Sequence, residues 1–334
     1  MTSTWEHRLV ALCAAALALV ATACGSAQQA PAPEAGPTRV FAADNGEITI
    51  PVAPQRVVAT GYAVPALIEA GAPLVGISTW ERGIPLMTPE DRATYDRLEK
   101  VAGELASETD YEAIATVQPD LIVIGVPAPV LADVDVARLE SLAPVVAIGP
   151  TIPSDWREVS RKQADAAGVL PALEALRADY EARAAELAQK YAPVVEGLRF
   201  GHVGAYGQIT NGTFQREFDG SWGTNILNDV GVRYYGQVEE AGPGSGQVSE
   251  YVSLEELGDA FREADVITYS VDPDGTPKDS VQQVLDSPLW PNLPAVQAGR
   301  TIPIRYTEAA TYRSALRTLD AIDEALAQLA TPAS

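Results

Sequence analysis

Residues 110–125 read DYEAIATVQPDLIVIG, and this stretch joins a helix start, a short helix, a turn and an apolar strand. A related stretch returns at 253–270 as SLEELGDAFREADVITYS. Glu112 and Glu255 hold equivalent places in the opening helical turn of the two copies, and each copy continues through an aspartate into a β-branched run. A chain that uses this unit once in each half is expected to consist of two similar lobes.

The size and composition agree with a two-domain globular protein. The chain has 334 residues, which exceeds the usual length of one domain. Hydrophobic residues make up 47% and charged residues 20%, which excludes a largely disordered protein. The formal net charge of -22 argues against nucleic acid as a partner, because phosphate binding requires a basic face.

The first 23 residues have the pattern of an export signal. An apolar stretch at 9–20 is too short to cross the ~30 Å hydrocarbon core of a membrane as a helix. The segment ATACGS at 21–26 resembles the lipobox of bacterial lipoproteins, although Ala21 stands where Leu is usual. The resemblance implies cleavage before Cys24 and lipid attachment there, with the protein anchored to the outer face of the bacterial cytoplasmic membrane. The alternative is an ordinary signal cut at the same bond.

Behind this signal the sequence predicts a tether and two lobes. Residues 24–38 are rich in Ala, Pro and Gln and have little to bury, which is typical of a flexible tether. Continuously apolar strands alternate with helical segments in 39–155 and again in 193–330. This alternation predicts α/β lobes whose mainly parallel sheets are covered by helices on both faces.

A helical connector is expected between the lobes, at 156–192. Its stretch 172–190 contains neither Gly nor Pro, and Pro171 is favoured in a first helical turn. We therefore predict one long spanning helix at about 171–191, which ends at Pro193.

Six short segments lie in a recognisable order along the chain. They are PQRVV at 54–58, GAPLVG at 71–76, QPDLI at 118–122, LAPVV at 142–146, SLE at 253–255 with ADV at 264–266, and PLW at 288–290 with AVQAGR at 295–300. Together they resemble the substrate-binding proteins of iron-siderophore and vitamin B12 ABC importers, over nearly the whole chain from Arg39. The resemblance implies two αβα lobes joined by a single long rigid helix, with the ligand held in a shallow cleft between them. A single connecting helix, with no paired flexible strands crossing between the lobes, is expected to allow only small lobe motion.

The same resemblance gives Glu112 and Glu255 a role, since family members dock one glutamate of each lobe against arginines of the membrane permease. A carboxylate in a first helical turn stays ionised, and an arginine can hold it with two hydrogen bonds. The alternative is that both only stabilise their helices. Family members often carry a further glutamate early in the first helix, but Pro65 occupies that place here and Glu69 lies off register.

Aromatic and arginine side chains gather in the loops expected at the cleft. Planar rings suit the apolar and π surfaces of a metal chelate, and arginine can bind its outward oxygens. Each of these residues could instead pack against its neighbours. The candidate ligand-binding residues are Tyr62, Trp80, Arg82, Tyr206, Arg216, Trp222, Tyr269, Arg305, Tyr306 and Arg313.

These features predict a monomeric carrier that delivers a ferric siderophore to an ABC permease, without catalysis, a metal site or a cofactor of its own. Cys13 lies in the predicted export signal and Cys24 is the predicted lipidation site, so the chain that follows has no cysteine. The lone histidine after the signal, His202, is expected to be structural. Cobalamin or haem remain alternative ligands, with Tyr206 or Tyr269 as a haem ligand. An exported sensor or surface lipoprotein is a distant alternative, as is a hydrolase, although the loop at 242–246 lacks the Gly-x-Ser-x-Gly spacing.

Overall fold

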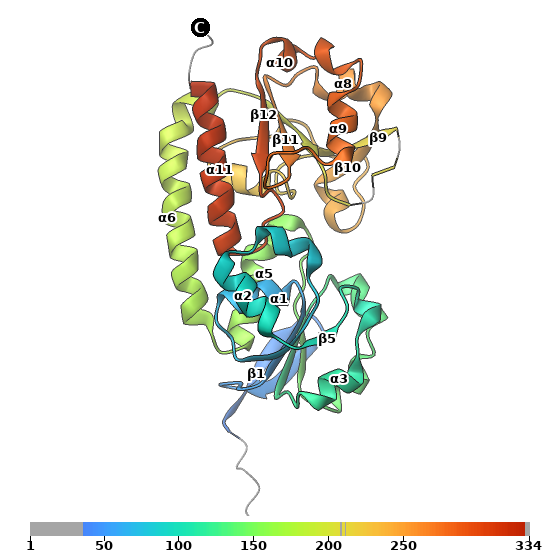
Figure 1. Ribbon diagram of the computed structural model, residues 1–334, viewed down its shortest axis with the longest axis vertical. Helices are drawn as coiled ribbons and strands as arrows, with labels where there is room; N and C mark the ends of the chain where they lie inside the picture. Colours follow the sequence, from blue (N-terminus) through green and yellow to red (C-terminus); the bar gives the residue numbers. More distant parts are fainter. Residues whose placement is uncertain (1–35, 208, 211, 331–334) are drawn as a thin grey trace, which may run out of the picture. The chain divides into compact units, whose positions relative to one another are not determined.

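The computed structural model describes residues 36–207, 209–210 and 212–330. The predicted export signal, Cys24 and most of the predicted tether lie outside these residues. The described chain begins with an antiparallel hairpin of β1 (Thr38–Ala43) and β2 (Gly46–Pro51) and continues into two lobes, each built on its own sheet (Figure 1). Both lobes belong to one compact unit.

The N-terminal lobe contains an entirely parallel sheet in the order β5-β4-β3-β6-β7. Its strands are β3 (Val57–Gly61), β4 (Leu74–Ser78), β5 (Lys100–Ala102), β6 (Leu121–Gly125) and β7 (Val145–Ala147), and its helices are α1 (Ala63–Glu69), α2 (Pro89–Arg97), α3 (Tyr111–Thr116), α4 (Val136–Glu140) and α5 (Trp156–Ala166). Val57 and Leu121 face the core that contains α1 and α5, whereas Val58 and Ile122 face the core that contains α3 and α4. Alternate side chains thus bury both faces, which explains the continuously apolar strands.

The C-terminal lobe contains a mixed sheet in the order β10-β9-β8-β11-β12. Strands β8, β11 and β12 are parallel, whereas β9 runs antiparallel to both β8 and β10. The antiparallel β8–β9 pair joins His202 to Glu217 and Gly204 to Gln215. The elements are β8 (Phe200–Gly204), β9 (Thr213–Glu217), β10 (Ser249–Ser253), β11 (Val266–Val271), β12 (Thr301–Arg305), α7 (Asn225–Asp229), α8 (Leu257–Phe261), α9 (Asp279–Leu285) and α10 (Pro294–Gln297).

Short 3₁₀ helices occupy many of the connections between these elements. The N-terminal lobe has η1 (Glu81–Leu86), η2 (Ala106–Glu108), η3 (Ala128–Asp133) and η4 (Pro153–Asp155), and the C-terminal lobe has η5 (Gly244–Gln247), η6 (Leu254–Glu256) and η7 (Trp290–Asn292).

The repeated sequence unit performs the same structural task in both lobes. The carboxylate of Asp120 accepts hydrogen bonds from the backbone N–H groups of Gln55 (2.7 Å) and Arg56 (2.9 Å), immediately before β3. The carboxylate of Asp265 accepts from the backbone N–H of Arg199 (2.9 Å), immediately before β8. Each aspartate therefore fixes the start of the neighbouring parallel strand, which supports the duplication inferred from the sequence.

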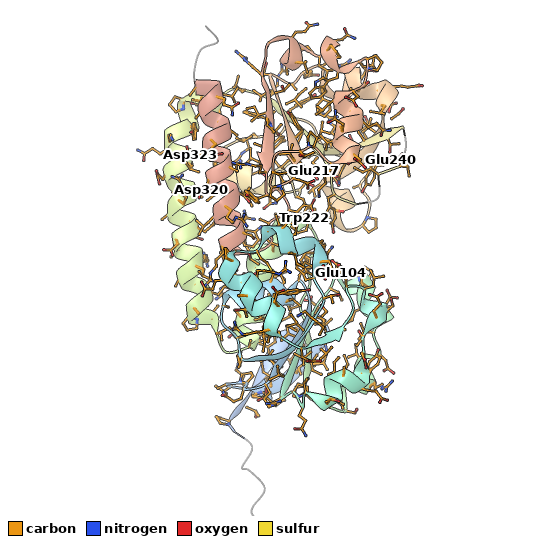
Figure 2. All side chains as sticks on the ribbon, viewed as in Figure 1. Glu104, Glu217, Trp222, Glu240, Asp320 and Asp323 are labelled. Carbon is orange, nitrogen blue, oxygen red and sulfur yellow. The ribbon has the colours of Figure 1, made fainter. Side chains whose placement is uncertain are left out.

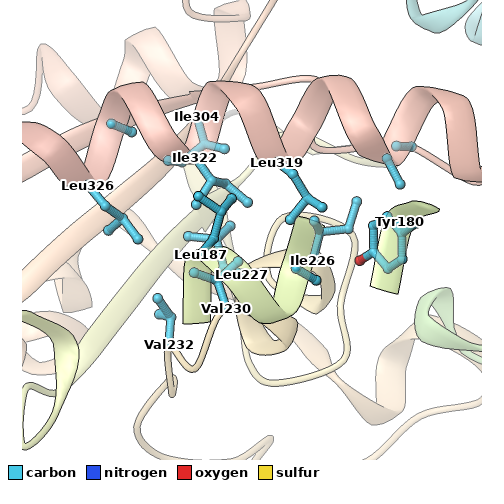
Figure 3. Close-up of a cluster of buried hydrophobic side chains, with 14 of the residues drawn as sticks. Tyr180, Leu187, Ile226, Leu227, Val230, Val232, Ile304, Leu319, Ile322 and Leu326 are labelled. Carbon is cyan, nitrogen blue, oxygen red and sulfur yellow. The ribbon is translucent and has the colours of Figure 1, made fainter. Parts of the chain in front are cut away.

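A long helix, α6 (Leu170–Val195), connects the lobes and packs beside the last helix, α11 (Tyr312–Ala330), as Figure 1 shows. Leu187 of α6 meets Leu319 and Ile322 of α11 in a buried cluster (Figure 3). The prediction that α6 ends at Pro193 is wrong, because the helix continues to Val195. Proline removes one backbone donor, but Val195 is buried in the same cluster and the helix closes with Glu196 N–H on Ala192 O (3.0 Å).

Candidate functional site

A pocket lies where the two lobes meet, beyond the carboxyl ends of the parallel strands. Ligand sites of open α/β sheets lie at this edge, because the connecting loops gather there. The N-terminal lobe lines this pocket with the start of α1 and the chain that follows β4. The C-terminal lobe lines it with the chain after β8, the turn after β9 and the approach to α11. The lining residues are Tyr62, Pro65, Ile68, Trp80, Arg82, Gly83, Leu86, Met87, Asp91, Tyr206, Trp222, Glu308, Ala310, Thr311 and Ser314.

Aromatic rings from both lobes meet inside this pocket. Tyr62 of the N-terminal lobe stacks on Trp222 of the C-terminal lobe, with ring centres 5.9 Å apart and planes 11° apart. The edge of Trp80 contacts Tyr62 at 4.9 Å, and Tyr206 lies 5.4 Å from Trp222. The hydroxyls of Tyr62 and Tyr206 are 3.3 Å apart, within hydrogen-bond distance. These four residues form the aromatic cluster, and Figure 2 shows Trp222 at the boundary between the lobes.

Arg82 closes the exposed side of the aromatic cluster. Its guanidinium lies 4.0 Å from the ring centre of Trp80 and 4.8 Å from that of Tyr62, and Nη1 donates to the Tyr206 hydroxyl at 3.3 Å. Gly83 permits this arrangement, since a Cβ atom there would lie 2.1 Å from the Trp80 ring. Arg82 thus combines cation–π contact with a hydrogen bond that joins the lobes.

The aromatic cluster fills most of the pocket. The remaining cavity volume is about 40 Å³, compared with the roughly 300–1,000 Å³ that small-molecule sites usually provide. A drug-sized ligand therefore requires the rings to turn aside or the lobes to separate. Burial raises the pKa of Tyr62 well above its usual range, so its hydroxyl stays neutral and can donate a hydrogen bond.

The charged groups at the pocket occur in pairs of opposite sign. Arg82 Nε lies 3.4 Å from Glu104 Oε1, Lys278 pairs with Glu308, and Arg313 Nη1 lies 2.6 Å from Asp91 Oδ1. Each cation brought to the pocket is thereby largely neutralised by its neighbour. Such a surface gives little electrostatic gain to a highly charged anion.

The structure brings together five of the ten predicted ligand-binding residues, namely the aromatic cluster and Arg82. Tyr269, expected in a loop, lies inside β11, where burial raises its pKa and its ring meets the edge of Trp290 at 6.4 Å. Arg216 pairs with Glu250 at 3.6 Å on the far side of β9. These two side chains do not line the pocket.

Three further candidates lie near α11. Arg305 pairs with Glu324, and Tyr306 has a positive φ of 61° and packs under Arg317 at 4.3 Å. Arg313 reaches the pocket only through its partner Asp91. Their side chains are engaged in contacts within the protein.

Behind Trp222, a buried polar network stiffens the C-terminal wall of the pocket. Glu217 Oε2 accepts from the backbone N–H of Gly223 at 2.6 Å, and burial raises the pKa of Glu217 to about 8. His202 is fully buried, 2.7 Å from Thr268 Oγ1 and 3.1 Å from Ser270 Oγ, and burial lowers its pKa to about 3. His202 is therefore a structural, uncharged residue, as predicted.

Glu112 and Glu255 point outward, one on each lobe. Asp110 caps α3 by accepting from the N–H of Glu112 (3.1 Å), and the Glu112 side chain is 89% exposed, with Arg138 at 3.6 Å. Ser253 accepts from the N–H of Glu255 (3.3 Å), and Glu255 is exposed beside a groove that also contains Asp279 and Asp286. Both glutamates thus stand two positions after a capping residue.

Sequence reasoning missed several pocket residues, above all those contributed by α2 and the approach to α11. Thr88 caps α2 and Pro89 is its first residue, a pattern that marks a helix start and would have predicted α2. No comparable local signal marks Glu308 or Thr311 as pocket residues. Among the described residues, we find no cluster of metal-ligating side chains and no helix of sufficient length and hydrophobicity to cross a membrane.

Comparison with known proteins gives consistent relatives. The family described as "Periplasmic binding protein" matches residues 57–306. A curated relative, the iron(3+)-hydroxamate-binding protein YxeB of Bacillus subtilis (strain 168), is 24% identical over 264 residues, which cover 78% of this chain and 76% of YxeB.

Solved structures show the same architecture. The siderophore periplasmic binding protein from the fuscachelin gene cluster of Thermobifida fusca is 31% identical with a TM-score of 0.66, over 82% of this chain and 97% of that one. Staphylococcus aureus SirA complexed with staphyloferrin B is 21% identical with a TM-score of 0.67, over 86% of this chain and 98% of that one, and supports the fold alone.

Proposed function

This chain belongs to the periplasmic binding protein family, and from that premise we propose that it captures a ferric siderophore between its lobes and delivers it to an ABC importer. Its homologues are substrate-binding proteins, so the chain is a binding protein and not an enzyme, and it carries no cofactor of its own. The family also implies export from the cytoplasm.

The observation that carries the proposal is the aromatic cluster at the lobe boundary. In a ferric siderophore the chelator already occupies the coordination positions of the iron, so a carrier needs surfaces for the organic shell. Rings from both lobes offer such surfaces, and the hydroxyls of Tyr62 and Tyr206 with the guanidinium of Arg82 offer hydrogen bonds at their rim. One relative is named for iron(3+)-hydroxamate binding and another for siderophore binding, and both names support the same ligand class.

Within that class, the paired charges favour a chelate of low net charge. A ferric tris-hydroxamate core is neutral, whereas a ferric tris-catecholate core carries three negative charges. Arg82, Lys278 and Arg313 are each already paired with a carboxylate. A trianionic chelate would have to break these ion pairs, or bind beside them with little electrostatic attraction. The Bacillus subtilis relative is named for iron(3+)-hydroxamate, which agrees with this preference.

We propose that Glu112 and Glu255 dock the protein to the permease. Their exposure and their matched position after a helix cap support this role, since two fixed carboxylates on separate lobes can pair with arginines of a two-fold membrane partner. We further propose that Cys24 is lipidated and holds the mature protein at the outer face of the cytoplasmic membrane. Replacement of Cys24 by Ala should then release the exported protein from the membrane fraction.

A ligand panel tests the proposal. The mature protein is titrated with iron-loaded hydroxamate, catecholate and carboxylate siderophores, with cobalamin and with haem, while tryptophan fluorescence is recorded. We expect saturable quenching by a ferric hydroxamate at about 1 μM or below, equivalent to ~8 kcal/mol of binding free energy. Saturation by cobalamin or haem alone would replace the ligand, and no binding in the panel would contradict the carrier function.

A matched pair of variants shows where the ligand binds. Trp222 lies in the aromatic cluster, whereas Trp290 packs against Tyr269 inside the C-terminal lobe. Trp222→Phe should lose a substantial part of the ligand-dependent quenching, with the rest coming from Trp80 in the same cluster, and Trp290→Phe should retain it.

A further inference from the structure

A carboxylate of the N-terminal lobe caps the last helix of the C-terminal lobe. Glu69 ends α1, and its Oε1 accepts from the backbone N–H of Tyr312 at 3.0 Å while Oε2 accepts from that of Arg313 at 2.9 Å. Tyr312 and Arg313 are the first two residues of α11. Only 4% of Glu69 is exposed, and 243 residues separate it from Tyr312 along the chain.

This arrangement completes the hydrogen bonding of the first turn of α11. The first N–H groups of a helix have no partner inside the helix and are usually satisfied by the residue just before it. Thr311 fills that local role only for Ser314, whose N–H it accepts at 3.3 Å. The two N–H groups that Thr311 leaves are bound by Glu69, with the added attraction between a carboxylate and the positive end of a helix dipole.

Two more contacts hold α11 to the N-terminal lobe at the same place. Arg313 pairs with Asp91 of α2 at 2.6 Å, and Arg317 donates to the carbonyl oxygens of Leu86 (3.1 Å) and Met87 (2.9 Å). Glu69 and these contacts together form what we term the inter-lobe clasp.

The inter-lobe clasp lies directly beside the pocket. Pro65 and Ile68 of α1 line the pocket, and so do Thr311 and Ser314 at the start of α11. Glu69 therefore joins two elements, one from each lobe, that both line the pocket. The contacts that cross the pocket at the aromatic cluster include the Tyr62–Trp222 stack, the hydroxyl pair of Tyr62 and Tyr206, and the hydrogen bond from Arg82 to Tyr206. An entering ligand can replace these contacts with its own.

We propose that Glu69 is a positioning residue, which fixes one edge of the lobe boundary so that the lobes part only at the aromatic cluster when ligand enters. Displacing the buried carboxylate would leave it and two helix N–H groups without partners, which makes opening at this edge costly. The ligand then enters between Arg82 and Tyr206, and the inter-lobe clasp limits how wide the pocket can open.

Distance measurement between the lobes tests this role without any ligand. In the full chain carrying Cys13→Ser and Cys24→Ser, the exposed residues Ser107 and Gln237 are replaced by Cys and spin-labelled. We expect one narrow distance distribution for this parent, and a broader one shifted to longer distances for Glu69→Gln, which keeps the side-chain shape but presents a donor to a backbone donor.

Asp110→Asn is the matched control, because Asp110 is also a carboxylate that accepts two backbone N–H groups at a helix start, but within one lobe. It should leave the distribution unchanged. An unchanged distribution for Glu69→Gln would overturn the proposal, as would an equal change for Asp110→Asn.

The affinity arm rests on the proposed function. Glu69→Gln should weaken binding of a ferric trihydroxamate roughly tenfold, a change typical of a lost hydrogen bond to a charged group, whereas Asp110→Asn should change it less than about twofold. If neither protein binds any siderophore, the carrier function fails while the distance result still decides the role of Glu69.

Amide hydrogen exchange provides a test that does not depend on a variant folding. The N–H groups of Tyr312 and Arg313 are protected by Glu69 alone among the described contacts. We expect both to exchange at least about tenfold more slowly than unprotected amides, because exchange requires the clasp to open. Exchange at the unprotected rate would overturn the proposal.

Discussion

The two lobes share the contacts made by the repeated unit and differ in the strand directions of their sheets. In both, an aspartate of the repeated unit, Asp120 or Asp265, fixes the start of the neighbouring parallel strand. Both also place an exposed glutamate two residues after a helix cap. The five-stranded sheets then diverge, since all strands of the N-terminal sheet are parallel, whereas β9 and β10 of the C-terminal sheet run antiparallel to their neighbours.

The repeated unit and the rest of the lobes therefore have different roles. The duplicated residues support the sheets and expose one carboxylate per lobe. The pocket is instead lined by segments outside the repeated unit, such as the chain from Trp80 to Met87 after β4 and the Trp222 turn that follows β9. Under the proposed function, the surface that meets a two-fold permease is duplicated, whereas the surface that meets the ligand is not.

The largest expected effect concerns the duplicated glutamates. If both glutamates dock to the permease as proposed, Glu112→Arg combined with Glu255→Arg should reduce siderophore-dependent iron uptake by cells at least about tenfold, because each change would place an arginine against the arginines of the permease. Affinity of the purified protein for the ligand should not change, because neither residue lines the pocket.

The exposed Glu240 serves as the control for charge reversal, since it lies in the C-terminal lobe outside the repeated unit (Figure 2). Glu240→Arg should preserve uptake. Full uptake by the double variant would show that the duplication serves the sheets alone.

Two buried glutamates outside the repeated unit, Glu69 and Glu217, should make the stability of the protein depend on pH. Burial raises the pKa of Glu217 to about 8 and that of Glu69 to about 7, from a usual 4.5. The folded state then keeps protons that the unfolded chain releases above pH 4.5. The contribution of each protonated glutamate to stability is fully present below pH 4.5, and it is lost as the pH rises through about 7 for Glu69 and about 8 for Glu217.

Urea unfolding at pH 5 to 8 measures this dependence. Each group should lower the unfolding free energy by about 1 kcal/mol per pH unit inside its window. Glu217→Gln should flatten the profile between pH 7 and 8, where Glu69 is already ionised, and Glu69→Gln should flatten it only below 7. A profile that rises across this range would contradict both assignments.

The sequence predicted the duplicated half of the structure better than the unique half. Strands buried on both faces carry their signal locally, as apolar runs between turn residues. Tyr206 and Tyr269 illustrate the limit, because both follow a strand start, yet Tyr206 lies beyond the end of β8 and Tyr269 lies inside β11. A shift of a few residues in the strand end decides which ring reaches the pocket.

Glu69 illustrates a second limit. Its sequence position identifies a glutamate at the end of a short helix, but its partners are the N–H groups of a helix 243 residues away. Contacts between distant backbone groups leave no pattern in the residues that donate them, since every residue except proline has an N–H. The inter-lobe clasp therefore becomes visible only when the lobes are placed together.

The third prediction compares the two aspartates of the repeated unit. Asp120→Ala leaves two backbone N–H groups without their acceptor, and Asp265→Ala leaves one. We expect losses in unfolding free energy of about 2 and about 1 kcal/mol, at roughly 1 kcal/mol per hydrogen bond. Thermal and urea unfolding measure both, with the exposed Asp133→Ala as the control. A larger loss for Asp265→Ala would mean that the aspartates are not equivalent supports.

The smallest expected effects distinguish the tryptophans that the lobes contribute to the pocket. Trp80 packs within its own lobe, against Arg82 at 4.0 Å, and its backbone N–H donates to the Tyr95 hydroxyl at 2.9 Å. Trp222 instead stacks on Tyr62 of the other lobe. Trp80→Phe should therefore lower the unfolding free energy by about 1 kcal/mol with little further effect on affinity, since a smaller ring leaves a void in its own lobe.

Trp222→Phe should instead change the unfolding free energy little and weaken ligand binding by about fivefold, because it reduces the ring surface that a ligand meets when the lobes part. Urea unfolding and ligand titration of both variants, each measured at pH 7, provide the comparison. If both lose stability and neither loses affinity, then the aromatic cluster is a structural seam between the lobes and the ligand binds elsewhere on the chain.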